Sequence, residues 1–186
     1  MWRRDGRGAT ALLAAPESAP NETMEQDARA RLARARPSLE FEFSIRAILG
    51  APIEQGTWEE RRRRIIPILE GTVEGARFKG RVLPGGADWQ TIRLADGAAQ
   101  IYARYTLQHE DGTVVGVINP GVRRGPPEVM ARLAAGEMVD PSSYYFRTAP
   151  QFEVAPGPHQ WLAENAFVCA GMRWPDSVEI DVYRVL

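Results

Sequence analysis

The chain has little of several residue types that would point to common functions. Its 186 residues contain one cysteine, Cys169, and two histidines, His109 and His159. A single cysteine cannot form an internal disulfide, and no Cys/His grouping has the spacing of zinc ligands. With two histidines we expect no histidine-rich metal site, and a Ser-His-Asp triad would have to use one of them. These absences disfavour both a metal site and serine-type hydrolysis.

An excess of charge of one sign is also absent, because 23 Lys and Arg residues stand against 24 Asp and Glu residues. Such a balance gives no global field that would attract nucleic acid or an anionic membrane. No apolar run reaches the length of about 18 residues that a transmembrane helix needs. No nucleotide-binding fingerprint occurs either. We therefore expect a small molecule as the partner, with no cofactor, nucleic acid or membrane. A homodimer stays open.

The first 37 residues differ in composition from the rest. Residues 1–23 are rich in Ala, Gly, Pro and charge and are expected to be disordered or loosely attached. Arginines before a short Ala/Leu run resemble a weak signal peptide, but Pro16 soon breaks the run. We expect a cytoplasmic protein, with secretion as the less favoured alternative and Met24 as an alternative start. Residues 24–36 predict a short helix that Pro37 ends, so the expected division is an extension over 1–37 and a domain over 38–186.

From Leu39 the apolar residues alternate with polar ones. The apolar positions of this first run are Leu39, Phe41, Phe43, Ile45 and Ala47. This period of two predicts a strand with one buried and one solvated face. A polar link over 55–63 follows, and then an apolar run over 65–69. Gly71 and Gly75 predict a turn or bulge, and Pro84-Gly85-Gly86 a tight turn.

Two Asp-Gly pairs predict an antiparallel meander. Asp96-Gly97 and Asp111-Gly112 each lie between runs with strand character and indicate hairpins. Residues 127–135 break the pattern with a Pro-led helix that Gly136 stops. Further strand runs are 144–147, 151–154, 160–174 and 178–185.

These runs predict an all-β protein with roughly eight to ten strands. A meander whose last strand can pair with its first favours a single closed antiparallel barrel, of the lipocalin-like kind, because closure removes exposed strand edges. The glycines at 71, 75, 80, 85 and 86 are then corner and turn residues, since a phosphate-binding loop would need a lysine and a following helix.

Residues from about 62 to 186 resemble the bacterial and fungal family called DUF3237 or UPF0311. The matching segments, in order, are Gly71–Gly75, Pro84–Trp89, Ala103–Tyr105, Asp111–Gly112, Tyr145–Thr148, Trp161–Leu162 and Asp181–Val185. The resemblance implies an antiparallel β-barrel of about eight strands with an interior cavity, in a family without one agreed activity. It does not include the head before Phe41.

Asp88 is the leading candidate for chemistry. It follows a Gly-Gly pair that lets the backbone approach a ligand closely, and its neighbour Trp89 offers a flat wall with a polar edge. A carboxyl group facing an apolar cavity would have a raised pKa and would suit a general acid or base. The competing interpretation is that Asp88 caps its own turn.

Arg104 and Arg147 lie in aromatic strand contexts, where a long charged side chain needs a partner or a ligand. A guanidinium offers a planar fork for a carboxylate, enolate or phenolate. Alternatively, each side chain extends outward over an aromatic neighbour. Because side chains alternate across a strand, Tyr102 and Arg104 share one face while Ala103 and Tyr105 share the other. Only one of these pairs can line the cavity.

Several aromatic and polar residues complete the predicted site. Tyr102, Tyr105, Tyr145, Trp161 and Asn165 are candidate ligand contacts, although aromatic residues of this kind more often belong to a core. Cys169 is expected to be a small buried residue, because no basic neighbour would activate its thiol. His109, beside Asp111-Gly112, is expected to be an exposed hairpin residue.

Two functions fit these residues. The first is a cofactor-independent enzyme, an isomerase, lyase, dehydratase or cyclase, in which Asp88 moves a proton and Arg104 or Arg147 stabilises an oxyanion on a small carbonyl-bearing or aromatic substrate. The second is a lipocalin-like carrier or sensor that uses the same pocket without chemistry. A packed barrel whose polar motifs only organise turns is the third interpretation.

Overall fold

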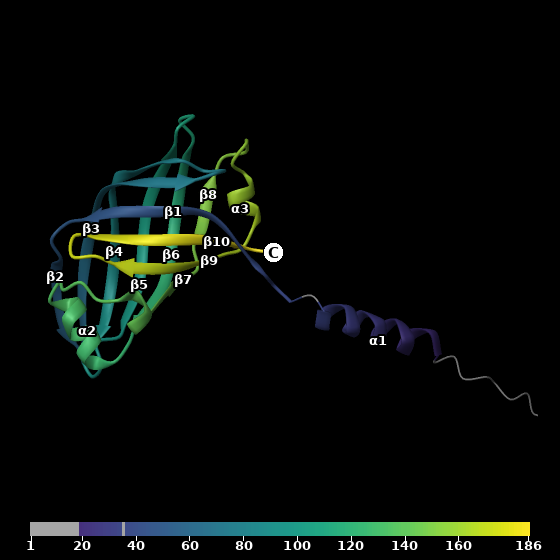
Figure 1. Cartoon of the computed structure of the whole chain (residues 1–186), viewed down its shortest axis with the longest axis horizontal. Coiled ribbons are helices and arrows are strands. Elements are labelled where there is room, and N and C mark those ends of the chain that lie inside the picture. The colour runs from purple at the N-terminus through teal and green to yellow at the C-terminus, as the bar shows by residue number, and fades with distance from the viewer. Residues whose placement is uncertain (1–18, 35) are drawn as a thin grey trace, which may run out of the picture. The chain divides into compact units, whose positions relative to one another are not determined.

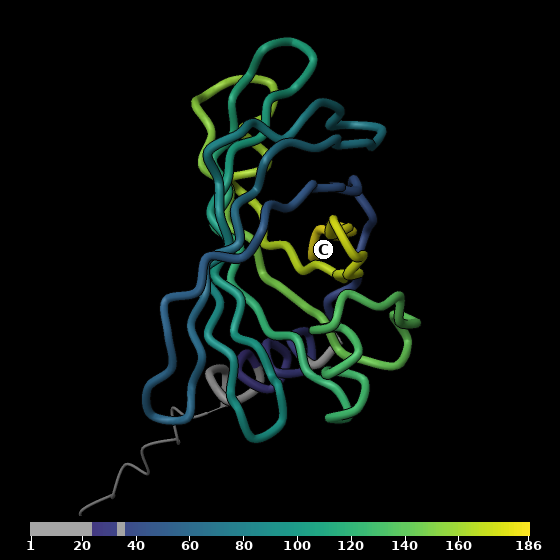
Figure 2. The backbone as a smooth tube through the Cα atoms, turned by 90° about the vertical axis from the view of Figure 1, so that its left-hand side faces the viewer, coloured from purple at the N-terminus to yellow at the C-terminus, as the bar shows by residue number. Residues whose placement is uncertain are grey.

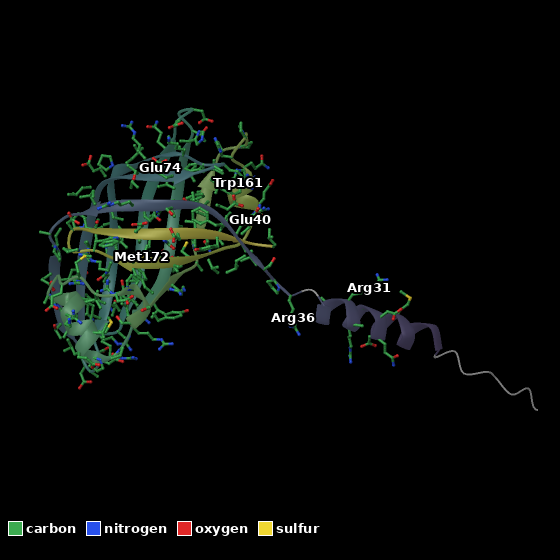
Figure 3. The ribbon with its side chains drawn as sticks, viewed as in Figure 1. Arg31, Arg36, Glu40, Glu74, Trp161 and Met172 are labelled. Carbon is green, nitrogen blue, oxygen red and sulfur yellow. The ribbon has the colours of Figure 1, made fainter. Side chains whose placement is uncertain are left out.

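The computed structural model of the protein describes residues 19–34 and 36–186. The chain divides after Pro37 into two units. In the first, helix α1 (Ala19–Arg34) begins before the predicted helix and includes an exposed Glu25–Arg29 ion pair of 2.7 Å. Its Arg31 and the nearby Arg36 are labelled in Figure 3. Of the head predicted over 1–23 to be disordered or loosely attached, residues 1–18 lie outside the described residues, and residues 19–23 belong to α1, contrary to expectation. None of the helices within 19–34 and 36–186 is long and apolar enough to span a membrane.

The second unit is a closed antiparallel β-barrel, as predicted (Figure 1). The strands of the ring, in the order in which they pair, are β1 (Leu39–Leu49), β10 (Ser177–Val185), β9 (Phe167–Arg173), β7 (Tyr145–Thr148), β6 (Val114–Arg124), β5 (Ala99–His109), β4 (Gly80–Arg93) and β3 (Arg61–Gly75). Strand β1 also pairs with β3 and closes the ring. Two strands lie outside it: β2 (Ile53–Trp58) pairs with β3, and β8 (Gln151–Val154) pairs with β6. Three short helical elements complete the unit: α2 (Pro127–Ala134), η1 (Pro141–Ser143) and α3 (Trp161–Glu164).

The first strand shows how the sequence pattern is refined by a bulge. From Phe43 onward the predicted alternation holds, and Phe43, Ile45 and Ala47 are buried. A register shift between Phe41 and Phe43 rotates the start of β1. Phe41 is therefore exposed, whereas Glu42 is buried and accepts a hydrogen bond of 2.7 Å from Nε of Arg184. The expectation that Leu39 and Phe41 face the core was wrong for this reason.

Two of the predicted turns are bulges inside long strands. Strand β3 runs through Gly71 and Gly75, with a register shift between Ile68 and Gly71. The Pro84-Gly85-Gly86 segment does not reverse the chain, because β4 continues through it with a register shift against β5. Gly85 has a φ of +100°, and a Cβ on Gly86 would lie 2.5 Å from Cβ of Tyr105. Here glycine is required for the bend and for the close approach of β5.

Other elements also differ from expectation in type. The predicted polar link over 55–63 is part of the β2–β3 hairpin, whose turn residues Glu59 and Glu60 have positive φ values of 51° and 57°. The predicted strand over 160–174 begins as helix α3 and becomes β9 at Phe167. The helix predicted over 127–135 is present as α2.

The barrel interior has two differently filled halves. Figure 2 shows that the β3–β4 and β5–β6 turns lie at one end of the barrel and the β2–β3 and β4–β5 turns at the other. Near the first end, buried aromatic rings pack together, with centroids 5.4 Å apart for Phe43 and Phe78 and 5.0 Å apart for Phe152 and Phe167. Near the second end the same strands line a cavity. We call these the aromatic end and the polar end.

Candidate functional site

The polar end holds an interior cavity of about 50 Å³. About 10–15 Å³ of such space is enough for one water molecule, so this cavity has room for several waters or for one end of a small organic molecule. Its walls are largely aliphatic, with contributions from β1, β3, β5 and β10. Seven polar side chains interrupt them: Asp88, Gln90, Tyr105, Asn119, Arg123, Thr148 and Arg173.

Asp88 lines the cavity from β4, one residue after Ala87, where regular pairing with β5 resumes beyond the bulge. Its Oδ1 accepts a hydrogen bond of 3.1 Å from the backbone N–H of Tyr102, and its Oδ2 accepts one of 2.5 Å from Nε2 of Gln90. Burial raises the pKa of the Asp88 carboxyl group, while these hydrogen bonds and the charges of Arg123 and Arg64 oppose the rise. The net direction is upward, so Asp88 keeps its proton at a higher pH than an exposed aspartate.

Three arginines lie at the polar end: Arg123 and Arg173 line the cavity, and the charges of Arg123 and Arg64 act on Asp88. Arg123 is 6% exposed, and its Nε has no hydrogen-bond partner among the described residues. Burial, followed by the like charges of Arg64 and Arg173, lowers the pKa of Arg123 to about 10. Arg64 donates from Nη2 to Oε1 of Gln90 at 2.9 Å, and Arg173 donates from Nη1 to the Ser177 carbonyl at 2.6 Å. With three guanidinium groups and the Asp88 carboxyl group, the polar end has a local excess of positive charge.

Further polar atoms of the cavity lack partners within residues 19–34 and 36–186. Nδ2 of Asn119 donates to the Tyr105 hydroxyl at 3.4 Å, but Oδ1 of Asn119 and Oγ1 of Thr148 are buried without a hydrogen bond from that part of the chain. A buried polar atom without a partner costs about 1–3 kcal/mol. Together with Nε of Arg123, these atoms supply donor and acceptor capacity at one cavity that a polar occupant would satisfy.

Of the residues predicted from sequence, two line the cavity. Asp88 does so from β4, and Tyr105 does so from β5, where burial raises the pKa of its hydroxyl group. The sequence left open which face of β5 turns inward, and the structure places Ala103 and Tyr105 inside. Tyr102 is 51% exposed. Arg104, on the same outer face, lies 3.9 Å from Glu153 in an exposed ion pair.

The remaining predicted residues lie away from the cavity. Trp89 follows Asp88 on the opposite face of β4 and is 43% exposed. Arg147 donates from Nη1 to the Phe146 carbonyl at 2.8 Å, and its guanidinium lies 5.3 Å from the ring of the exposed Tyr145. Trp161 packs under Arg77 at 4.0 Å, and Nδ2 of Asn165 donates to the Trp161 carbonyl at 2.7 Å. Trp161, labelled in Figure 3, is the first residue of α3.

Sequence reasoning missed Gln90, Asn119, Arg123, Thr148 and Arg173. A usable signal existed for the first three, because a period of two carries the inward face of β4 from Asp88 to Gln90 and that of β6 from Val117 to Asn119 and Arg123. Cys169 is buried as expected, and burial raises the pKa of its thiol to about 12. His109 was expected to be exposed but is half-buried, because its ring packs against Phe78 at 5.1 Å.

The fold and the site define a closed antiparallel β-barrel with a polar interior cavity. This chain belongs to the family described as "Protein of unknown function (DUF3237)", whose profile matches residues 37–185. The match includes β1 and β2, which lie before residue 62, where the resemblance from sequence motifs began.

The relatives agree with this assignment. A UPF0311 protein of Rhodopseudomonas palustris is 43% identical over 152 residues, which is 81% of this chain and 99% of that protein. A UPF0311 protein of Clostridium acetobutylicum is 40% identical over 144 residues, 77% of this chain and 90% of that protein. A crystal structure of a conserved protein of unknown function from Rhodopseudomonas palustris has a TM-score of 0.77 at 42% identity and covers 81% of this chain and 98% of that chain. At 18% identity and a TM-score of 0.61, an enzyme from Penicillium herquei shares the fold, with 81% of this chain and 95% of that chain covered.

Proposed function

We propose that the protein is a cofactor-independent enzyme that binds a small carbonyl-bearing or aromatic molecule in the polar cavity and moves a proton with Asp88. The reaction class is that of an isomerase, lyase, dehydratase or cyclase. One observation carries the proposal: a half-buried carboxyl group with a raised pKa and a buried guanidinium whose Nε is unpaired within the described chain line the same cavity. Groups with perturbed pKa values that converge in a cavity mark candidate active sites.

The roles follow from the charges. Asp88 is the acid/base group, because an elevated pKa brings a carboxyl group closer to the operating pH, where proton transfer is most effective. Arg123 is positioned to stabilise an oxyanion or enolate through its Nε–H, and this replaces the roles that the sequence suggested for Arg104 and Arg147. The Tyr105 hydroxyl is a neutral hydrogen-bond donor, because burial keeps it protonated. Gln90 positions Asp88.

The substrate class follows from the lining. Aliphatic walls favour an apolar body, and the arginine excess favours oxygen atoms that carry negative charge. With about 50 Å³ of space, the cavity takes the reacting end of the molecule. The Penicillium herquei enzyme has the same fold, which supports catalysis as a use of this barrel, while the residues that carry the proposal belong to this chain.

A carrier or sensor is the second candidate. The buried atoms of Asn119, Arg123 and Thr148 that lack partners in the described chain favour binding of a polar ligand, and binding alone satisfies them. In that case Asp88 would only contribute to ligand contacts.

Hydrogen–deuterium exchange separates the two functions and does not require the natural substrate. The protein is incubated in D₂O with small ketones, enones and phenolic acids, and NMR measures both binding and exchange at carbon atoms next to the carbonyl group. If the protein is the proposed enzyme, the wild type accelerates this exchange, and Asp88→Asn reduces the acceleration by about 10²–10⁴-fold while it still binds the compound. Glu153→Gln, which changes an exposed carboxyl group outside the cavity, is the matched control. Equal exchange in Asp88→Asn and the wild type would remove Asp88 from the mechanism.

A further inference from the structure

A second cluster of functional side chains lies at the aromatic end. The chain has two histidines, and the fold brings both rings together with their centroids 4.1 Å apart. Asp111, in the β5–β6 turn, contacts both histidines: Oδ1 is 3.0 Å from Nδ1 of His109, and Oδ2 is 2.9 Å from Nε2 of His159. One ligand atom of each of the three residues falls within 4.8 Å of the others.

The geometry of this cluster is close to that of a metal site. Zinc binds His nitrogen and carboxylate oxygen at about 2.0–2.2 Å, so tetrahedral ligands lie roughly 3.3–3.5 Å from one another. Both histidine–carboxylate separations are already slightly below this value. Closing the cluster on an ion therefore requires the ligand atoms that are furthest apart, at up to 4.8 Å, to approach each other by up to about 1.4 Å.

The surroundings fit a metal site as well. Phe78 is fully buried and packs against both histidines, with centroid distances of 5.1 and 5.3 Å, which fixes the rings from the barrel side. His159 is 6% exposed, and its Nε2 faces Oδ2 of Asp111. His109 also lines an open hollow with Lys79 and Glu74, which gives an ion an entry path from solvent. Glu74 is labelled in Figure 3.

Backbone hydrogen bonds position two of the ligands. The backbone N–H of Thr113 donates to Oδ1 of Asp111 at 2.8 Å. The backbone N–H of Asp111 donates to Nδ1 of His109 at 3.1 Å. A metal ion bound at that nitrogen would compete with this hydrogen bond.

We propose that His109, Asp111 and His159 form a binding site for a divalent transition-metal ion of the zinc type, with one further position open to water. Two imidazoles and one carboxylate suit zinc and cobalt better than calcium or magnesium, which prefer oxygen ligands. The ion would join the β5–β6 turn to the segment before α3 and so stabilise the aromatic end. This site is separate from the polar cavity, and the proposal does not depend on the proposed enzymatic function.

The competing interpretation is a hydrogen-bonded turn without metal, and Asp111→Asn distinguishes the two. An asparagine keeps a side-chain oxygen for the Thr113 N–H and therefore the turn, but it removes the anionic ligand. The full chain is prepared without a histidine tag and freed of metal, and Co²⁺ and Zn²⁺ are titrated separately. Visible absorption reports Co²⁺ coordination, calorimetry reports Zn²⁺ affinity, and the melting temperature reports stabilisation.

We expect the wild type to bind one equivalent of either ion with a rise in melting temperature. Asp111→Asn and His159→Gln should weaken binding at least about tenfold, whereas Glu110→Gln, at an exposed neighbour paired with Lys79, should bind like the wild type. Absence of stoichiometric binding by the wild type, or unchanged affinity in Asp111→Asn, would overturn the proposal. Because Asp111 is exposed and its replacement keeps the turn, the test stands even if His159→Gln does not fold.

Discussion

The two ends of the barrel interior are built from the same strands but contain different kinds of side chain. At the aromatic end, Phe43, Phe78 and Leu107 are fully buried in one hydrophobic core. At the polar end, β5 instead presents Ala103 and Tyr105 to a cavity that is also lined by Asn119, Arg123 and Thr148, each with a buried polar atom unpaired in the described chain. One end provides stability, and the other gives up stability for polar groups that a ligand can use.

The largest effect on stability should come from removing a buried ring at the aromatic end. Phe78→Ala removes a fully buried ring that contacts Phe43 and both histidines, and we expect it to lower the free energy of unfolding by about 3–5 kcal/mol. Urea denaturation followed by circular dichroism measures the change. Phe41→Ala, on the half-exposed ring beside the bulge, should cost below about 1 kcal/mol. Similar losses in both variants would mean that the aromatic end is not the stability centre.

At the polar end, replacing a buried side chain should not lower the free energy of unfolding. Arg123→Met replaces a buried guanidinium, whose Nε is unpaired within the described chain, with an apolar side chain, and we expect the free energy of unfolding to stay the same or to rise by about 1–3 kcal/mol. The same denaturation experiment applies. Arg104→Met, on the outer face of β5, should change stability by about 0.5 kcal/mol or less. A loss of several kcal/mol in Arg123→Met would show that Arg123 is a structural residue.

The smallest effect concerns the pH dependence that Asp88 contributes. Because its folded pKa is raised above the ordinary value of 3.8, the protonated form favours folding, and this contribution is lost as the pH rises from about 4 through the raised pKa. We therefore expect the stability of the wild type to fall, relative to Asp88→Asn, over that window. Urea midpoints of both proteins across the pH range from about 4 to 8 measure the difference. A difference that runs in the opposite direction would mean that hydrogen bonds outweigh burial at Asp88.

The strands and turns of the barrel could be predicted well from the sequence because they depend on patterns that are local. Alternation in β1 and β10, the Asp-Gly turns and the Pro-led helix α2 each follow from residues that lie next to one another. Bulges are the exception. The rotation of Phe41 out of the core and the passage of β4 through Gly85 depend on which strand lies opposite, and a single sequence does not contain that information.

The site could be predicted only in part, because some of its residues are recognisable from local sequence and others only from the strands opposite them. Asp88 and Tyr105 could be named from local context, but the choice between the two faces of β5 required the curvature of the barrel. Arg123 was missed because a charged residue next to Arg124 resembles a solvated strand end, although the period of two that runs through Asn119 reaches it. The pairing of His109 with His159 depends on where the segment before α3 returns to the β5–β6 turn, which spacing along the chain does not reveal.

The most direct test of the division between the two ends is ligand binding by a matched pair of arginine variants. Ligand-observed NMR with small keto and phenolic acids at up to about 1 mM measures binding to the wild type, Arg123→Met and Arg104→Met. We predict that the wild type and Arg104→Met bind members of this class with equal affinity and that Arg123→Met binds them at least about tenfold more weakly. Equal binding by all three proteins, or no binding by the wild type, would contradict the proposed function of the polar end.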